Sequence, residues 1–239
     1  VVPCYNEEAV LHETASRLKD KLSGMIAAGS ISENSRVLFV NDGSKDRTWQ
    51  IITELHEADS LFSGLKLSRN RGHQNALLAG LMTAKEHADM VISMDADLQD
   101  DINAVDQFVA HYYKGCDIVY GVRSSRDTDT AFKRGTAQGF YKFMRVLGVD
   151  IVDNHADYRL MSKRALEALS EYGEVNIFLR GIVPQLGFPT ATVPYERGER
   201  FAGESKYPLK KMLAFAFDGI TSFSVKPIRF VTVLGVIIF

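Results

Sequence analysis

The strongest constraint on the fold is a regular alternation of short β-rich runs with helical patterns over the first half of the chain. The β-rich runs are VVP at the start, RVLFV (36–40), GLKLS (64–68), MVISM (90–94) and DIVYG (117–121). Helical patterns fill the stretches between them, near 7–28, 46–60, 73–88 and 101–114. Such alternation is built from right-handed crossovers, so it predicts an α/β fold with a mostly parallel sheet flanked by helices.

Polar residues follow each of these β-rich runs at the point where it ends. The segments that follow are CYNEE, NDGSKD, RNRGH, DADLQD and VRSSR, in chain order. Ligands of open parallel sheets bind at the carboxyl ends of the strands. The polar strand ends therefore predict one shared site at that edge of the sheet.

The segment DADLQD carries the most specific chemistry of the set. Asp95 and Asp97 stand two residues apart directly after a buried run, and Gln99 follows. Carboxylate and amide oxygens suit Mg²⁺ or Mn²⁺ and leave positions open for phosphate oxygens. The alternative is a solvated turn that starts the helix at 101–114, with Asp100 or Asp101 as its cap. The position after a buried strand favours the metal site.

Two other strand ends carry groups suited to a nucleoside. In PCYNEE, Pro3 would shape the turn, Tyr5 could stack on a base, and Glu7 could accept a base N–H. In NDGSKDRT, Gly43 predicts a tight turn and Asp42 could accept hydrogen bonds from a base or ribose. Turn and helix-start chemistry alone would explain either motif. Because G-x-G and Walker A patterns are absent from the sequence, a nucleotide would not be bound as NAD is, or as ATP is in a P-loop.

The segment RNRGHQNA (69–76) combines two arginines and an asparagine with Gly72 at a predicted helix start. We interpret His73 in it as an exposed or capping histidine rather than a catalyst. Asp46 is the predicted N-cap of the helix at 46–60.

The net charge of −2 names no class of partner and argues against general nucleic-acid binding. Basic residues are instead concentrated in two clusters, Arg123, Arg126, Lys133 and Arg134, and Arg197, Arg200, Lys206, Lys210 and Lys211. Clusters of this kind indicate a specific anionic ligand. The two cysteines, Cys4 and Cys116, form neither a disulfide framework nor a metal motif, and we predict two buried side chains in a reducing compartment.

The C-terminal part differs in character. From Pro208 to Phe223 apolar residues recur at helical spacing, which is typical of a core helix or of one on a membrane surface. The last ten residues, FVTVLGVIIF, carry no charge and follow Lys226 and Arg229, which favours the opening of a truncated transmembrane helix. We therefore predict an α/β catalytic domain (1–207), an amphipathic juxtamembrane helix (208–226) and the start of a transmembrane segment (227–239).

Taken together, PCYNEE, VNDGSKDRT, LSRNRGHQNALLAG and DADLQD, in this order and spacing, resemble the family 2 glycosyltransferases with the GT-A fold. The segments GVRSSR, DYRLMS and RFAGESKYPL look like the branch that acts on polyprenyl phosphates, which includes dolichyl-phosphate mannose synthase and the bactoprenol glucosyltransferases. The resemblance covers essentially the whole chain.

The resemblance implies roles residue by residue. It implies a nucleoside site at Pro3, Tyr5, Glu7 and Asp42, a diphosphate and metal site at Asp95 and Asp97 with Gln99 as a further ligand, Asp157 beside the acceptor as candidate base, and phosphate contacts from Arg123, Arg126, Arg200, Ser205 and Lys206. The alternative for Asp157 is a local ion pair with Arg159.

The implied reaction is inverting transfer of a sugar from a nucleotide-diphospho-sugar to a polyprenyl phosphate, with Mg²⁺ or Mn²⁺. The similarity to the bactoprenol glucosyltransferases favours UDP-glucose as the donor and undecaprenyl phosphate as the acceptor. The product would serve cell-envelope glycan synthesis or O-antigen modification. The implied location is the bacterial cytoplasmic membrane, with the catalytic domain in the cytoplasm. A homo-oligomer is compatible with the family.

Several alternatives stay open or are weakened by the sequence. The donor could be GDP-mannose or UDP-GlcNAc, and the acceptor could be a non-lipid molecule. A processive synthase would carry Q-x-x-R-W, whereas the single tryptophan is Trp49. A sugar-nucleotide pyrophosphorylase would carry a glycine-rich N-terminal loop, which PCYNEE is not. A degenerate scaffold would be expected to lack Asp97 or the arginines, and these are present.

Overall fold

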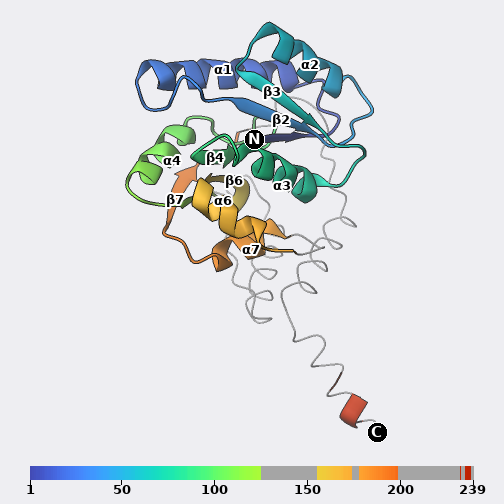
Figure 1. Ribbon diagram of the computed structural model, residues 1–239, viewed down its shortest axis with the longest axis vertical. Helices are drawn as coiled ribbons and strands as arrows, with labels where there is room; N and C mark the ends of the chain where they lie inside the picture. The colour runs from blue at the N-terminus through green and yellow to red at the C-terminus, as the bar shows by residue number, and fades with distance from the viewer. Residues whose placement is uncertain (125–154, 174–177, 199–231, 233–234, 238–239) are drawn as a thin grey trace. The chain divides into compact units, whose positions relative to one another are not determined.

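A computed structural model describes residues 1–124, 155–173, 178–198, 232 and 235–237 (Figure 1). The chain forms two compact units: Val1–Ser125 with Asn154–Gly173 and Gly187–Glu204, and Arg126–Asp153 with Glu174–Leu186 and Ser205–Phe239. The predicted site residues Arg126, Arg200, Ser205 and Lys206, and the predicted helix at 208–226, lie outside the described residues.

The first sheet contains the three N-terminal strands. It has the order β1 (Val2–Cys4), β2 (Val37–Asn41), β3 (Phe62–Lys66), and both pairs are parallel. In Figure 1, α1 (Leu11–Ala27) and α2 (Thr48–Ala58) lie on one side of this sheet, and α3 (His73–Ala84) lies on the other. This arrangement confirms the predicted parallel α/β architecture.

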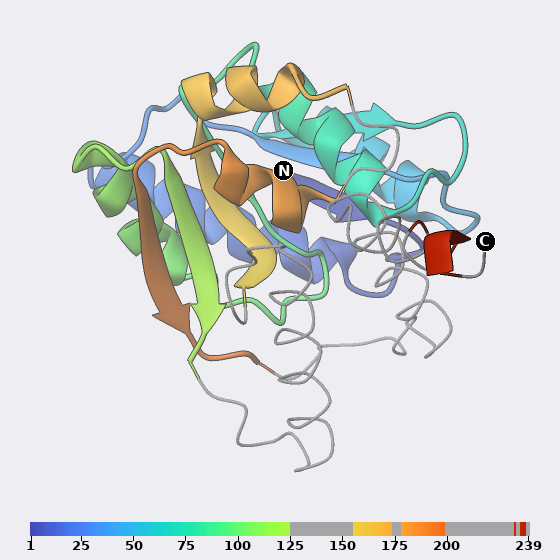
Figure 2. The same cartoon turned by 90° about the horizontal axis from the view of Figure 1, so that it is seen from below.

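The second sheet has the order β4 (Met90–Ser93), β6 (His155–Ser162), β5 (Ile118–Arg123), β7 (Thr190–Tyr195). Figure 2 shows β7 and β5 side by side, and they are parallel. Strand β6 is antiparallel to both of its neighbours, which is the one exception to the parallel pattern among the described strands. Two hydrogen bonds join β1 to the end of β4, from Val1 N to Ile92 O (2.7 Å) and from Met94 N to Val1 O (3.1 Å), so the two sheets adjoin.

The remaining described helices are α4 (Ala104–Tyr113) and α6 (Lys163–Ser170) in the first unit and α7 (Leu179–Gln185) in the second. Helix α6 begins directly after β6 because the Ser162 hydroxyl accepts a hydrogen bond from Ala165 N.

Some local predictions need correction. Pro3 lies inside β1 rather than in the turn that follows. Neither Asp100 nor Asp101 caps α4, because Asp101 accepts from Asn103 N before that helix begins and Asp100 points elsewhere. Asp46 lies one residue before the N-cap of α2, but its carboxylate does accept a hydrogen bond from Thr48 N.

The core of the first unit is apolar and continuous. Phe39 of β2 is fully buried and stacks on Phe62 of β3, with ring centroids 5.9 Å apart. Cys4 is buried, and burial raises the pKa of its thiol, so it behaves as the predicted small core residue. Cys116 is only partly buried and packs against the same core.

The predicted transmembrane segment lies largely outside the described residues. Thr232 and residues 235–237 are described, and they are helical. Within the described part of the chain, no helix combines the length and the apolar character needed to cross a membrane.

Candidate active site

The loops that follow β1 and β2 are tied together by reciprocal hydrogen bonds. Asn6 has a left-handed φ of 55° and makes hydrogen bonds to the loop after β2 in both directions. Its backbone N–H donates to Ser44 Oγ (3.0 Å), and its side-chain oxygen accepts from Lys45 N (2.8 Å). Glu7 N donates to Thr48 Oγ1 at the start of α2 (2.8 Å). The half-buried side chains of Tyr5 and Glu7 therefore project from a surface that is fixed by two strand ends.

Asp42 binds the loop that follows β3. Its carboxylate accepts hydrogen bonds from Arg71 N (2.6 Å) and Gly72 N (3.0 Å). Burial raises the pKa of Asp42, while these backbone N–H groups and the charge of His73 act in the opposite direction. Asp42 thus fixes a neighbouring loop, a role that sequence reasoning did not assign to it.

Gly43 allows the same two loops to approach closely. Its φ is +64°, and a Cβ atom there would lie 2.4 Å from Asn70 N. No side chain fits into that space without displacing backbone. The predicted tight turn at Gly43 is therefore confirmed, with a packing reason that the sequence does not contain.

The acidic loop (residues 95–101) follows β4. Asp95 is partly exposed, and Asp97 accepts a hydrogen bond from Gln99 N (3.2 Å) across a tight turn in which Leu98 has a φ of 59°. The side-chain oxygen of Gln99 accepts from the Arg197 guanidinium, and Gly198 N donates to Gln99 O (2.9 Å). The loop is therefore attached to the segment that follows β7.

Asp100 is the buried member of this loop, with 6% of its surface exposed. Its Oδ1 accepts from the Tyr195 hydroxyl (2.6 Å), and its Oδ2 has no hydrogen-bond partner among the described residues. The pKa of Asp100 is raised to about 6. Burial is the largest cause, followed by the charge of Asp95, and the charge of Asp97 adds to them; the Tyr195 hydrogen bond and the charge of Arg123 act in the opposite direction.

These carboxylates fit a hard divalent cation. Three acidic side chains repel one another, one buried oxygen is unsatisfied, and carboxylate oxygens are the preferred ligands of Mg²⁺ and Mn²⁺. Within the described ranges, no group of three or more His, Cys, Asp or Glu side chains is already arranged as a metal site. Gln99, the predicted further ligand, has its oxygen engaged by Arg197.

Asp157 enters the site from β6. Because β4 and β6 are antiparallel with Ser93 opposite Arg159, continuing the register by two residues places Asp157 opposite Asp95. Asp157 is buried; its Oδ1 accepts from Arg159 (2.5 Å) and its Oδ2 from Gln74 Nε2 (3.1 Å). The Asp157–Arg159 ion pair, which is the alternative that the sequence offers for Asp157, is thus present, together with an amide contact from Gln74 that the sequence does not predict.

His73 lies between the two carboxylates. Its Nε2 is 3.5 Å from Asp157 Oδ2 and 3.7 Å from Asp95 Oδ1. The structure thus brings Asp95 and Asp157 together around the first turn of α3. The histidine that the sequence predicts to be exposed or capping is partly buried between them. The contact of His73 with Asp157 joins residues more than eighty positions apart, so no local pattern could have shown it.

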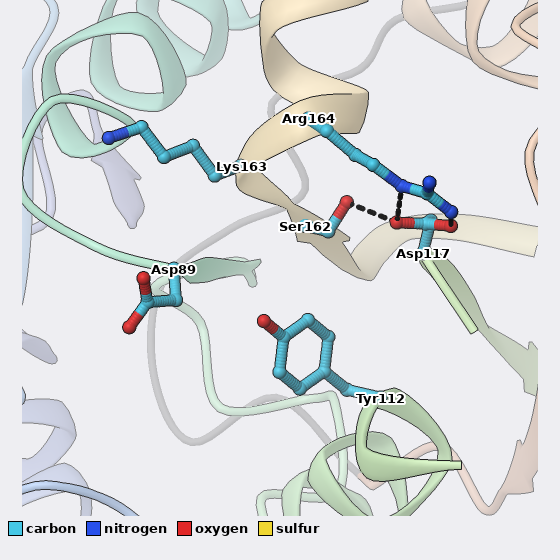
Figure 3. Close-up of a pocket in the computed structure, with 6 residues that line it drawn as sticks. All are labelled: Asp89, Tyr112, Asp117, Ser162, Lys163 and Arg164. Atoms are coloured by element: carbon cyan, nitrogen blue, oxygen red, sulfur yellow. Dashed lines mark hydrogen bonds and ion pairs between the residues drawn. The ribbon is translucent and has the colours of Figure 1, made fainter. Parts of the chain in front are cut away.

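A hollow of about 270 Å³ lies away from this site (Figure 3). Its lining residues are Asp89, Tyr112, Asp117, Ser162, Lys163 and Arg164. Asp89 and Asp117 precede β4 and β5, so this hollow lies at the amino ends of those strands. Figure 3 shows Arg164 and Ser162 converging on Asp117, an arrangement that neutralises the carboxylate within the protein.

Comparison with known proteins covers most of the chain. Residues 1–170 match the family model described as Glycosyl transferase family 2. A Bacillus subtilis (strain 168) protein named Uncharacterized glycosyltransferase YkoT is 59% identical over 239 residues, covering 100% of this chain and 71% of that protein. The Prophage bactoprenol glucosyl transferase homolog of Escherichia coli (strain K12) is 37% identical over 244 residues, covering 100% of this chain and 76% of that protein. The Bactoprenol glucosyl transferase of Shigella phage SfV is 38% identical, covering 100% and 75%.

Solved structures share the fold. Glucosyl-3-phosphoglycerate synthase from Mycobacterium tuberculosis, in complex with Mn²⁺, UDP and phosphoglyceric acid, has a TM-score of 0.55 at 14% identity, covering 90% of this chain and 72% of that chain. Mannosyltransferase PcManGT from Pyrobaculum calidifontis, in complex with GDP-Man and Mn²⁺, has a TM-score of 0.53 at 19% identity, covering 85% and 56%. These similarities confirm a GT-A-like α/β fold.

Proposed function

The chain belongs to glycosyl transferase family 2, and from that membership we propose that it transfers glucose from UDP-glucose to undecaprenyl phosphate with inversion at the anomeric carbon. The observation that carries the proposal is the meeting of Asp95 and Asp157 at His73. Asp95 belongs to the loop that we assign to the donor diphosphate, and Asp157 to the strand that we assign to the acceptor. A donor and an acceptor at these two carboxylates would be held next to each other, as direct displacement requires.

We assign the donor site to the strand ends of the first sheet and to the acidic loop. Tyr5, Glu7 and Asp42 would bind the nucleoside, with Pro3 supporting them from β1. A divalent cation, Mg²⁺ or Mn²⁺, held by Asp95 and Asp97 would neutralise charge on the diphosphate and on the leaving nucleotide. Gln99 remains the proposed further ligand. To bind the cation, its side-chain oxygen must release the hydrogen bond from the Arg197 guanidinium. The Mn²⁺ and UDP bound by the structural neighbour from Mycobacterium tuberculosis support this assignment.

The acceptor assignment rests on the relatives named bactoprenol glucosyl transferases. An oxygen of the acceptor phosphate would attack the anomeric carbon, the bond from that carbon to the diphosphate oxygen would break, and the nucleoside diphosphate would leave with the electron pair. A phosphate monoester, with a second pKa of about 6, is already largely ionised at neutral pH. Asp157, fixed on both oxygens by Arg159 and Gln74, would therefore orient the acceptor more than it removes a proton from it.

Cationic side chains would offset the repulsion between two phosphorylated substrates. Arg123 lies at the end of β5, beside the acidic loop. We propose that it contacts phosphate together with Arg126, Arg200, Ser205 and Lys206, since guanidinium groups bind phosphate oxygens in pairs.

A lipid acceptor would place the reaction at a membrane. We propose the cytoplasmic face of the bacterial inner membrane, with the segments 208–226 and 227–239 in contact with it. The product would be a lipid-linked glucose that donates sugar to cell-envelope glycan or O-antigen.

The test is glycosyl transfer by the full-length protein in detergent, from a panel of labelled nucleotide sugars to undecaprenyl phosphate. The panel contains UDP-glucose, UDP-GlcNAc, UDP-galactose and GDP-mannose, each with Mn²⁺, with Mg²⁺ and with EDTA. Asp97→Ala should abolish transfer, whereas Asp106→Ala, on the half-exposed surface of α4, should keep it.

The outcomes separate the parts of the proposal. Transfer from UDP-glucose alone would support it in full, and transfer from another sugar nucleotide would change the donor only. Hydrolysis of a donor without transfer to the lipid would contradict the acceptor assignment and direct the search to a soluble or protein acceptor.

A further inference from the structure

Strands β5 and β7 end together at the edge of the sheet that carries the site. Arg123 and Tyr195, their last residues, are register partners. Ser124 reinforces this end because both its backbone N–H and its hydroxyl donate to Tyr195 O (2.9 and 3.0 Å). The backbone of Tyr195 is therefore fixed directly beside Arg123.

The Tyr195 ring has one well-defined place. It is 3% exposed and packs edge-on against Tyr158, with ring centroids 5.3 Å apart and an interplanar angle of 85°. Gly121 makes room for both rings, since a Cβ there would lie 3.1 Å from Tyr195 Cε1 and 2.9 Å from Tyr158 Cδ1. Because both rings are closely packed, the position of the Tyr195 hydroxyl is determined by the core.

This hydroxyl lies beside two charged groups. It donates to Asp100 Oδ1 (2.6 Å), and the Arg123 guanidinium, on the register partner of Tyr195, acts on the same carboxylate through its charge. Asp100 is buried and its other oxygen is unsatisfied within the described residues, as is the buried Nε of Arg123. A buried carboxylate with one partner is strongly dependent on that partner, because a lost hydrogen bond to a charged group is not replaced by water.

We infer that Tyr195 is a positioning residue for the proposed transfer, whose hydroxyl fixes the Asp100 carboxylate under the acidic loop and couples that loop to Arg123. The inference rests on the proposed function. Its consequence is that the Asp95–Asp97 turn and the Arg123 guanidinium are held at fixed positions on the donor diphosphate. Tyr195 itself touches neither donor nor acceptor in this scheme; it acts through Asp100 and Arg123.

The test compares Tyr195→Phe with Tyr158→Phe in the full-length protein in detergent. The two variants remove hydroxyls from neighbouring rings that both contact the acidic loop, but the Tyr158 hydroxyl donates to the backbone oxygen of Asp101 (2.9 Å) rather than to a carboxylate. One measurement is amide hydrogen exchange of residues 95–101, and the other is binding of UDP with Mn²⁺, beside Mn²⁺ alone.

We expect Tyr195→Phe to accelerate exchange in the acidic loop and to weaken Mn²⁺-dependent UDP binding by about tenfold, the equivalent of one hydrogen bond to a charged group. Tyr158→Phe should change the UDP affinity clearly less. In transfer assays the loss should appear as a higher donor KM, with the KM for the lipid unchanged.

Equal effects of the two variants on UDP affinity, or unchanged loop exchange in Tyr195→Phe, would overturn the inference. If the wild-type protein bound no sugar nucleotide with either metal, the proposed function would fail. The exchange comparison would then still decide whether Tyr195 fixes the loop.

Discussion

Replacing Gly43 by alanine tests the close approach of two loops on which the proposed nucleoside site depends. The residue has a φ of +64°, a conformation that costs an alanine about 1–2 kcal/mol. In addition, its Cβ would lie 2.4 Å from Asn70 N and 2.5 Å from Arg69 C, so the loop after β3 must move. That loop supplies the two N–H groups that bind the carboxylate of Asp42.

The expected loss follows from these terms. Weakening of the two hydrogen bonds to a buried carboxylate adds about 2–3 kcal/mol to the backbone cost, for a total of about 3–5 kcal/mol. Gly29→Ala is the matched control, because Gly29 has a similar φ of +68° but no neighbouring heavy atom within 4 Å of an added Cβ. It should lose only the backbone cost of about 1–2 kcal/mol.

The assay is urea unfolding of the full-length protein in detergent, followed by circular dichroism, with UDP binding measured on each variant. Gly43→Ala should unfold at lower urea concentration than Gly29→Ala and should bind UDP more weakly. Equal free energies of unfolding for the two variants would refute the reasoning, because the approach of the loops would then contribute nothing.

Three further predictions concern the carboxylates and the cation. Gln74→Ala should lower kcat by roughly tenfold with little change in donor KM, because it removes one of the hydrogen bonds that orient the Asp157 carboxylate; an unchanged kcat in steady-state transfer assays would argue against this role. Arg164→Gln should lower stability at pH 7 only slightly, since Arg164 is largely exposed and solvent screens its ion pair with Asp117. The hydrogen bond from Arg164 lowers the pKa of Asp117, so this stabilisation is present above the ordinary carboxyl pKa and is lost as the pH falls through the lowered pKa of Asp117. The difference in free energy of unfolding between wild type and variant, measured in urea, should therefore disappear toward pH 3. A difference that does not change with pH would contradict this prediction. EDTA should reduce UDP binding in calorimetry by at least about tenfold and Mn²⁺ should restore it, whereas binding that ignores EDTA would remove the cation from the donor site.

Much of the proposed donor site could be predicted from the sequence, because its signals are local. The alternation of strands and helices specifies parallel pairing, and the polar residues of PCYNEE, NDGSKD and DADLQD follow their strands in the structure as expected. The offset of β3, which begins at Phe62 rather than at residue 64, has a tertiary cause: Phe62 packs against Phe39 of the neighbouring strand.

The surroundings of Asp157, which we assign to the acceptor, were less predictable because their contacts are made over long sequence separations. The composition of a strand does not record its direction, so the antiparallel run of β6 could not be read from HADYRLMS. The placement of His73 between Asp95 and Asp157, and of Tyr195 beside Asp100, depends on that pairing. Such contacts arise from sheet order and register rather than from any motif.

The reversed direction of β6 has an evolutionary consequence. The chain leaves the second sheet after Arg123 and returns at His155, and Val122 and His155 are register partners on adjacent strands. Because the register of β5 and β6 already brings these two positions together, homologues can differ in sequence and length between the two strands while keeping the pairing that sets Asp157 opposite Asp95.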